Sequence, residues 1–170
     1  MKISKIELKK FRSIEKCLIE LNDLNAIVGQ NNSGKSAIIR ALNCFFNFKD
    51  EEINFIQGKH HYNPSSTPVI TLTFIDFDPE FEEYSDNSIL QIQQSFKSSN
   101  KKAIYKYKRN GAYVNAPDTL LELINSKISF VYIPPNRTRA SYALSTSVPR
   151  SSDGSSSLVY TAGYSEEEPY

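Results

Sequence analysis

The segment from Gly29 to Ser36 has the residue types and spacing of a phosphate-binding loop. Its sequence, Gly-Gln-Asn-Asn-Ser-Gly-Lys-Ser, matches the pattern G-x-x-x-x-G-K-[ST] at every position. Glycines let such a backbone curl so that successive N–H groups point at phosphate oxygens, and the helix that follows adds the positive end of its dipole. Lys35 would bring a positive charge to the β- and γ-phosphates, and the Ser36 hydroxyl would ligate Mg²⁺. The segment therefore predicts a nucleotide site.

A glycine-rich turn that precedes a helix by chance is the alternative. At average residue frequencies, such a match arises roughly once in a couple of hundred chains of this length. The flanking residues favour the functional interpretation. The run Leu24 to Val28 is apolar and continuous, as expected of a buried strand, and Ile38, Leu42 and Phe45 recur at helical spacing after Lys35. Strand, loop and helix are the context that the motif requires.

The elements around this loop are predicted from periodicity and turn residues. Alternating apolar positions indicate two strands joined around Phe11-Arg12-Ser13, and Asn110-Gly111 predicts a hairpin turn. Asp78-Pro79 and Pro117-Asp118 are typical helix starts. The expected elements are strands containing Ile6 and Leu8, then Cys17, Ile19 and Leu21; strands at 69–74, 90–96, 102–108, 112–115 and 128–133; and helices at 80–84 and around Leu120, Leu121 and Ile124.

Length and composition limit the class of protein. The 170 residues carry a net charge of +1 and are 39% apolar, which suits one domain, or one domain plus a tail, and lacks the strongly basic character of a wholly DNA-binding domain. No apolar run approaches about 18 residues, so no membrane association is expected. Cys17 and Cys44 lack paired spacing and sit at apolar positions, which favours core residues in a reducing cytoplasm.

The composition changes near Thr138. Residues 138–170 are rich in serine, end in an acidic stretch at 166–168 and show no helical or strand period. We therefore expect an ordered lobe over residues 1–137 and a mostly disordered tail over residues 138–170.

Two segments resemble a known family. Residues Lys2 to Ile14 and Leu24 to Ser36 look like the start of an SMC/RecF-like (ABC-type) ATPase head, and Asn31 to Ser36 is similar above all to the "overcoming lysogenisation defect" (OLD) family. The resemblance covers the chain to about Phe48 and continues loosely to residue 137. It implies an α/β P-loop NTPase fold, whose N-terminal lobe combines antiparallel strands with the parallel sheet that carries the loop.

The resemblance also implies a function. ATP and Mg²⁺ are the expected cofactors, and heads of this kind pair into homodimers or larger assemblies. DNA and a defence-system protein are candidate partners, because OLD-type members carry a C-terminal Toprim nuclease domain and act in anti-phage defence. SMC/RecF-like members act in DNA repair and chromosome organisation. A fragment of a RecF/SMC-like repair ATPase is therefore an alternative to the role in defence.

The resemblance implies which residues of this chain bind the nucleotide: those of the loop, the residue after the loop and an arginine that follows the first strand. An ordinary solvated turn is the alternative role for that arginine. The predicted nucleotide-binding residues are Gly29, Gln30, Asn31, Asn32, Ser33, Gly34, Lys35, Ser36, Ala37 and Arg12, with Ser36 as the Mg²⁺ ligand.

A complete ATPase needs more than a phosphate loop. We find no apolar run ending in Asp-Glu that would serve as an acidic Walker B strand; Thr73 to Asp78 is the nearest segment. No catalytic residue is therefore identified, and we expect the chain to be the N-terminal portion of a longer ATPase, with little turnover alone. A non-catalytic module that docks on a full-length ATPase or on a defence partner is the alternative. A small kinase or GTPase has less support, because no Asn-Lys-x-Asp motif is present.

Three other features have competing interpretations. His60-His61 suggests a metal, but a solvated loop is favoured, because adjacent histidines point apart and no third ligand is nearby in the sequence. The lysines and tyrosines at 101–113 suggest a nucleic-acid surface, but an ordinary amphipathic hairpin with its lysines on the solvent side is favoured. Arg137 and Arg139 are candidate contacts to phosphate, DNA or a partner head, or exposed loop residues.

Overall fold

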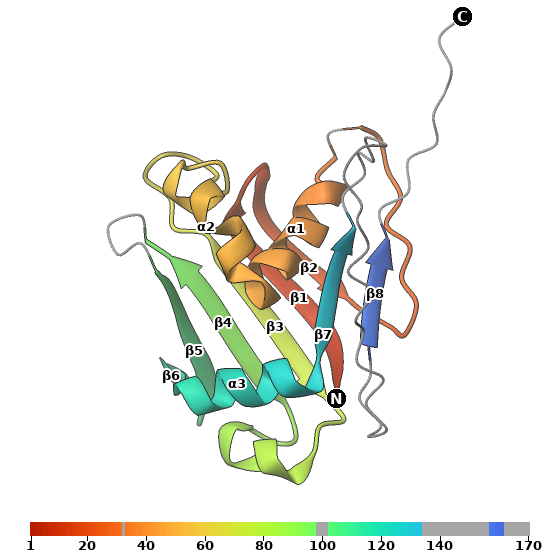
Figure 1. Ribbon diagram of the computed structural model, residues 1–170, viewed down its shortest axis with the longest axis vertical. Helices are drawn as coiled ribbons and strands as arrows, with labels where there is room; N and C mark the ends of the chain where they lie inside the picture. Colours follow the sequence, from red (N-terminus) through yellow and green to blue (C-terminus); the bar gives the residue numbers. More distant parts are fainter. Residues whose placement is uncertain (32, 98–101, 134–156, 162–170) are drawn as a thin grey trace, which may run out of the picture.

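The computed structural model describes residues 1–31, 33–97, 102–133 and, as backbone, 157–161. Figure 1 shows how the elements are arranged. In chain order they are β1 (Lys2–Phe11), β2 (Ile14–Glu20), α1 (Lys35–Phe46), α2 (Phe48–Ile56), β3 (Val69–Ile75), the 3₁₀ helix η1 (Pro79–Tyr84), β4 (Leu90–Phe96), β5 (Ala103–Arg109), β6 (Ala112–Asn115), α3 (Asp118–Lys127), β7 (Ser129–Ile133) and β8 (Ser157–Thr161).

Six strands form one antiparallel sheet in the order β2-β1-β3-β4-β5-β6. One face is the core: in β4 the buried residues Leu90, Ile92, Gln94 and Phe96 alternate with partly exposed ones, as a period of two requires. The β5–β6 turn at Asn110 and Gly111 has positive φ at both residues, 51° and 79°. Such a turn matches the right-handed twist of the flanking strands, so this dipeptide fixes their register.

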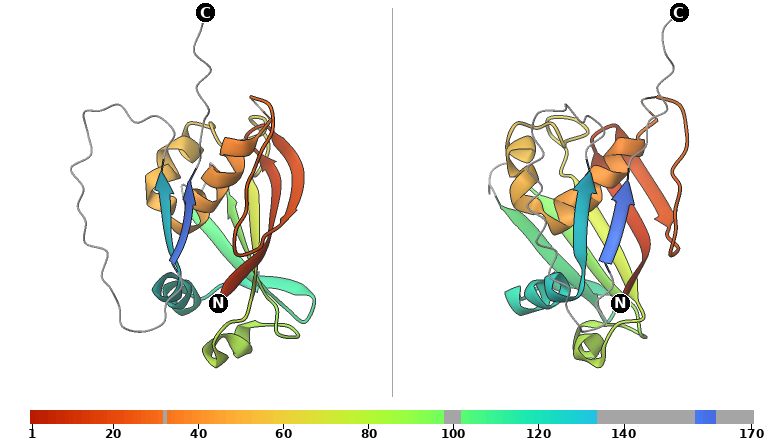
Figure 2. Two further views of the ribbon diagram at one scale, coloured as in Figure 1. Left: turned by 90° about the vertical axis from the view of Figure 1, so that its right-hand side faces the viewer. Right: turned by 45° about the vertical axis from the view of Figure 1, so that its right-hand side comes forward.

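Helix α1 lies between two sheets. On one side Phe45 packs edge-on against Tyr105 and lies near Phe74 of the large sheet, with ring centroids 5.8 and 6.3 Å away. On the other side Phe46 stacks on Phe130 of β7, which pairs in parallel with β8. Figure 2 shows the large sheet on one side of α1 and β7 on the other. Burial on two sides explains why α1 is apolar around most of its circumference.

The end of α1 is held by side chains of the large sheet. The amide Nε2 of buried Gln94 donates to the carbonyl oxygen of Cys44 at 2.7 Å and lies 2.6 Å from the Tyr105 hydroxyl, which donates to the carbonyl oxygen of Phe45 at 3.2 Å. These bonds satisfy carbonyls that a helix end leaves without intrahelical donors. The sheet therefore fixes the position of the helix that follows the glycine-rich loop.

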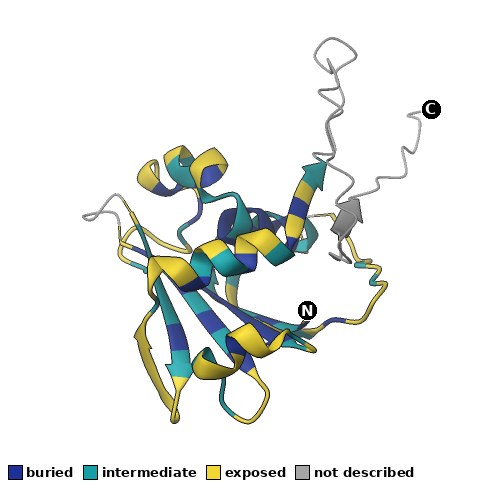
Figure 3. Ribbon diagram, turned by 60° about the horizontal axis from the view of Figure 1, so that its bottom comes forward, coloured by how far each residue is buried: buried dark blue, intermediate teal, exposed yellow. Residues whose placement is uncertain are grey.

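Two further helices complete the packing. Helix α2 begins directly after Asn47, which ends α1, and Phe48 stacks on Phe55 within it. Helix α3 buries Leu120 and Ile124 and exposes its other side (Figure 3). The sequence patterns did not predict α2, because its two aromatic residues are separated by a largely charged and polar stretch.

Most of the predicted elements are confirmed. The strands of the large sheet, the hairpin turn, the helix after Lys35, the short helix after Asp78-Pro79, the helix after Pro117 and the strand at 129–133 all form. The mixed α/β class with a large antiparallel component is confirmed with them. Cys44 is fully buried, as predicted, and Cys17 is partly buried against the core.

The strand predicted from Leu24 to Val28 is wrong. These residues form an irregular segment, in which Leu24 is 91% and Val28 is 87% exposed. A continuous apolar run becomes a buried strand only when neighbouring strands pair with both of its edges. In the part of the chain that the structure describes, no strand pairs with this segment.

Strand β8 lies in the segment predicted to lack regular structure, where the parallel pairing with β7 supplies the strand. The other residues of that prediction, and Arg137 and Arg139, lie outside the described residues. Among the described residues, no helix combines the length and apolar character needed to span a membrane.

Replacing Gln94 tests the link between the sheet and α1. We expect Gln94→Ala to lower the free energy of unfolding by about 2 kcal/mol, because buried acceptors at the end of α1 lose their donor. The matched control is Gln93→Ala, on the opposite face of the same strand, which should change it by less than about 0.5 kcal/mol. Urea denaturation measures both, and equal losses would contradict a specific role for Gln94.

Candidate functional site

The glycine-rich loop folds around the Lys35 side chain. Its ammonium donates to the carbonyl oxygens of Gly29 and Gln30, the latter at 2.7 Å. A Cβ atom at Gly29 would lie 2.9 Å from the Ser33 hydroxyl oxygen, so a larger residue there would require the Ser33 side chain to rotate. Gly29 and Ser33 are therefore close together across the loop.

Gly34 forms the junction between this loop and α1. Its φ is +92°, which other L-residues rarely adopt. Its carbonyl accepts from the N–H groups of Ala37 and Ile38, so the helix begins here. The first turn of α1 has no acidic side chain. The positive end of the helix dipole therefore faces the loop without a neutralising carboxylate from its own first turn.

A cavity of about 410 Å³ opens at this helix start. This volume lies within the range of ligand pockets in proteins. Of the described residues that line it, three have cationic side chains and none has a carboxylate. The lining residues are Arg12, Ser13, Ser33, Gly34, Lys35, Ser36, Ala37, Lys59 and His61. A cavity of this charge is suited to an anionic ligand.

Arg12 lies in the turn between β1 and β2, where the backbone is strained. Its φ is +52°, an uncommon conformation for a residue with a side chain. Its N–H donates to the carbonyl oxygen of His60 at 2.9 Å, and the N–H of Tyr62 donates to the carbonyl oxygen of Lys10 at 3.1 Å. Residues 60–62 thus run beside the end of β1 and hold the turn that brings Arg12 to the cavity.

The solvated loop predicted for His60-His61 is wrong for His60. Its ring is fully buried, stacks on Phe11 and meets Phe55 edge-on. The physical reason is the preceding helix α2, which the sequence pattern did not predict and which supplies Phe55. Because His60 is anchored inside, its neighbours Lys59 and His61 reach the cavity on either side of it.

His61 differs in charge from the lysines that line the same cavity. Burial lowers the pKa of His61, and nearby His60 lowers it further, against a smaller opposing effect of the Gly58 backbone. The ring is therefore neutral at pH 7. Neither Lys59 nor His61 was predicted as a nucleotide-site residue, since His61 was considered only as part of a possible metal site and no local pattern marks Lys59.

The predicted nucleotide-binding residues fall into two groups. Arg12 and the segment from Ser33 to Ala37 line the cavity together. Gly29, Gln30 and Asn31 form the exposed part of the loop, and Asn32 lies outside the described residues.

The hairpin of β5 and β6 carries the lysines and tyrosines noted in the sequence, and in β5 these two residue types lie on opposite faces. Tyr105 and Tyr107 point to the core side of β5, where Tyr105 contacts Phe45, whereas Lys106 and Lys108 alternate with them on the outer side. This is the amphipathic hairpin of the simpler interpretation. The two tyrosines are not arranged for stacking with nucleic-acid bases.

Comparison with known proteins adds a family. The family described as "AAA ATPase domain" matches residues 1–156. The chain is 24% identical over 99 residues to the endonuclease GajA of Bacillus cereus (strain VD045), covering 58% of the chain and 17% of GajA. It is 33% identical over 102 residues to the uncharacterized protein MJECL44 of Methanocaldococcus jannaschii, covering 56% of the chain and 30% of that protein. The chain thus spans less than a third of these curated relatives.

Solved structures share the fold. A structure from work on ATP-driven dimerization and DNA-stimulated activation of SMC ATPases is 23% identical, with a TM-score of 0.55, covering 73% of this chain and 77% of that one. The Smc head domain of Pyrococcus yayanosii is 22% identical, with a TM-score of 0.54, covering 73% of this chain and 25% of that one. The structure of RecF with ATP is 17% identical, with a TM-score of 0.51, covering 79% of this chain and 33% of that one. The predicted resemblance to SMC/RecF-like ATPase heads is thereby confirmed, and so is the predicted fold class.

Replacing Gly34 tests the backbone at the junction. We expect Gly34→Ala to lower the free energy of unfolding by about 1–2 kcal/mol, because its φ is unfavourable for any residue with a Cβ atom. Chemical denaturation measures the change, with Ser33→Ala in the adjacent exposed position as the control. A Gly34→Ala protein as stable as the wild type would rule out the left-handed conformation.

Proposed function

This chain belongs to the AAA ATPase domain family, and from this premise we propose that it binds ATP and Mg²⁺ in the cavity at the start of α1. The observation that carries the proposal is the combination of Arg12, Lys35 and Lys59 around a helix N-terminus, with no carboxylate among the lining residues. Such a site favours phosphate groups through both charge and backbone donors.

Each lining residue has a proposed role. Lys35 would exchange its bonds to the loop carbonyls for contacts to the phosphates, and Arg12 and Lys59, which line the same cavity, would add two further positive charges. The hydroxyl of Ser36 would hold Mg²⁺, which, when bound, neutralises phosphate charge. The described lining suits the triphosphate, because it holds three cationic side chains and three serine hydroxyls without a carboxylate, and Ser36 offers one oxygen ligand to the Mg²⁺ that would accompany it.

The same lining set argues against efficient hydrolysis by this chain alone. Hydrolysis needs a group that positions or activates the attacking water, and the lining residues in the part of the chain that the structure describes include no acidic side chain. We therefore infer that turnover depends on residues beyond those lining the cavity, in a paired head or elsewhere in a longer protein. ATP-driven dimerization is reported for an SMC ATPase of the same fold, which supports pairing of two heads.

The biological setting is a finer proposal. The similarity of residues 31–36 to OLD-type ATPases and the alignment with the endonuclease GajA support a role in anti-phage defence. DNA is the proposed partner, since an SMC ATPase of this fold is activated by DNA. A repair ATPase of the RecF/SMC type remains the alternative.

A second function is favoured by a separate observation. Leu24 and Val28 are almost fully exposed, although both are large apolar residues and the segment between them is largely apolar. Exposed apolar runs of this kind are suited to contact with another protein surface. On this alternative, the chain is a non-catalytic module that docks on an ATPase or a defence protein, and ATP turnover by the purified 170-residue chain would exclude it.

Replacing Lys35 tests nucleotide binding directly. We expect Lys35→Ala to abolish ATP binding in calorimetry, because the charge closest to the loop is lost. Lys106→Ala, on the outer face of the sheet, removes the same charge elsewhere and should leave the affinity unchanged. Equal affinities for the two variants would refute the proposed site.

Lys59 was identified from the structure and provides an independent test. We expect Lys59→Ala to weaken ATP binding by about tenfold or more, as loss of a charged hydrogen bond would. AMP binding should be less affected than ATP binding if Lys59 acts on the outer phosphates. An unchanged affinity for ATP would place Lys59 outside the nucleotide contacts.

A further inference from the structure

Glu51 of α2 is a buried carboxylate that accepts four hydrogen bonds. It is only 3% exposed. Its Oε1 accepts from Arg40 Nη1 at 3.2 Å and from Asn43 Nδ2 at 2.9 Å. Its Oε2 accepts from Asn54 Nδ2 at 2.7 Å and lies 2.7 Å from His60 Nε2. All acceptor positions of the carboxylate are thus occupied, by donors from α1, from α2 and from the segment that follows α2.

These donors keep Glu51 ionised. Burial alone would raise the pKa of Glu51, but hydrogen bonds from His60, Asn43 and Asn54 outweigh it and lower the pKa to about 2. Because an ionised carboxylate only accepts hydrogen bonds, the His60 nitrogen that faces it carries the proton.

His60 links this carboxylate to the cavity wall. Its ring is fully buried and stacks on Phe11, with ring centroids 5.2 Å apart. Its carbonyl oxygen accepts the hydrogen bond from the Arg12 N–H. An unbroken chain of contacts therefore runs from α1, through Glu51 and His60, to the strained turn that carries Arg12.

We propose that Glu51 is a positioning residue for the nucleotide site, which sets the distance between the start of α1 and Arg12 by holding His60. This inference rests on the proposed function, because it assigns Glu51 a role in nucleotide affinity. Glu51 does not line the cavity, so it acts only through the groups that it holds.

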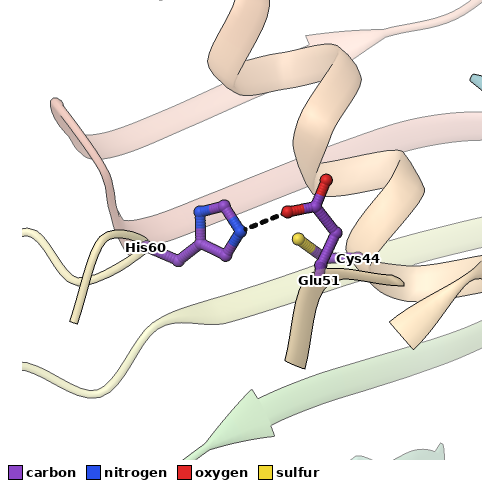
Figure 4. Close-up of side chains that lie close together, drawn as sticks. All are labelled: Cys44, Glu51 and His60. Atoms are coloured by element: carbon purple, nitrogen blue, oxygen red, sulfur yellow. Dashed lines mark hydrogen bonds and ion pairs between the residues drawn. The ribbon is translucent and has the colours of Figure 1, made fainter. Parts of the chain in front are cut away.

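A metal ion is the competing explanation for the same residues. Cys44, Glu51 and His60 offer ligand atoms within 4.8 Å of one another (Figure 4). The observed bonds favour the hydrogen-bonded network instead. The carboxylate is already saturated with donors, and burial, together with the charge of Glu51, raises the pKa of the Cys44 thiol, whereas metal coordination needs the thiolate.

Glu51→Gln is the first test, made in the 170-residue chain. The amide keeps the shape of the side chain but replaces one acceptor oxygen with a donor, so it cannot accept all four bonds. We expect ATP affinity to fall about tenfold. Asn54→Ala is the matched control, because it removes one donor to the same carboxylate and leaves the His60 bond intact; it should change the affinity by less than about twofold.

A double-mutant cycle separates positioning from general loss of stability. If Glu51 acts through Arg12, Glu51→Gln in the Arg12→Ala background should weaken binding by less than about twofold. If Glu51→Gln lowers ATP affinity about tenfold in the Arg12→Ala background as well, the proposal is overturned. Should Glu51→Gln fail to fold, His60→Phe serves in its place, since it keeps the ring stack on Phe11 and removes only the donor; the same non-additivity with Arg12→Ala is expected.

Three further results would each bear on a different part of the proposals. Unchanged affinity in Glu51→Gln, with binding lost in Lys35→Ala, would overturn this inference and leave the proposed function intact. No ATP binding by the wild type would remove both. Stoichiometric zinc in the purified protein, detected by elemental analysis and lost in Cys44→Ser, would overturn the hydrogen-bonded network in favour of a metal site.

Discussion

Helix α1 must be buried along its length and open at its first turn, and the rest of the described structure follows from this constraint. Packing between two sheets gives the helix its stability, which its short length could not supply alone. The sheet side chains Gln94 and Tyr105 bind carbonyl groups at the far end. The polar groups at the near end are left to the loop and the cavity, where an anion is the suited partner.

The part of the cavity lining that Arg12 contributes is held by a less common arrangement. Arg12 has an unfavourable backbone conformation, which persists only where surrounding contacts impose it. The bond to His60 and the stack of His60 on Phe11 provide those contacts, and the saturated Glu51 carboxylate fixes His60 in turn. A buried charge with all its acceptor positions filled defines one geometry and strongly disfavours others, because any shift leaves a buried polar group without a partner.

The sequence predicted the elements whose local pattern agrees with their environment. Apolar residues alternate with polar ones along the strands at 69–75 and 90–96, and in the strand at 90–96 burial alternates in the same way because one face packs on the core. Asn110-Gly111 can adopt the turn that the hairpin needs. The failures occurred where distant residues decide the outcome. Leu24 to Val28 has the composition of a strand but no pairing strand, and the environment of His60 depends on Glu51 and Phe55. Lys59 and His61 reach the cavity only because His60 is anchored, which no local pattern records.

The insertion of both helices between β2 and β3 affects how the molecule assembles from the unfolded chain. Hairpin β1–β2 is local, but β1 also pairs with β3 in a register that joins Lys2 to Ile75. Closing so long a loop costs chain entropy before any contact compensates it, so this pairing is expected to be slow. Residues 12, 35 and 59 are likewise far apart in the sequence, so they come together only when long segments of chain have closed. A ligand that contacts all three can therefore stabilise the finished fold but cannot accelerate the early steps that lead to it.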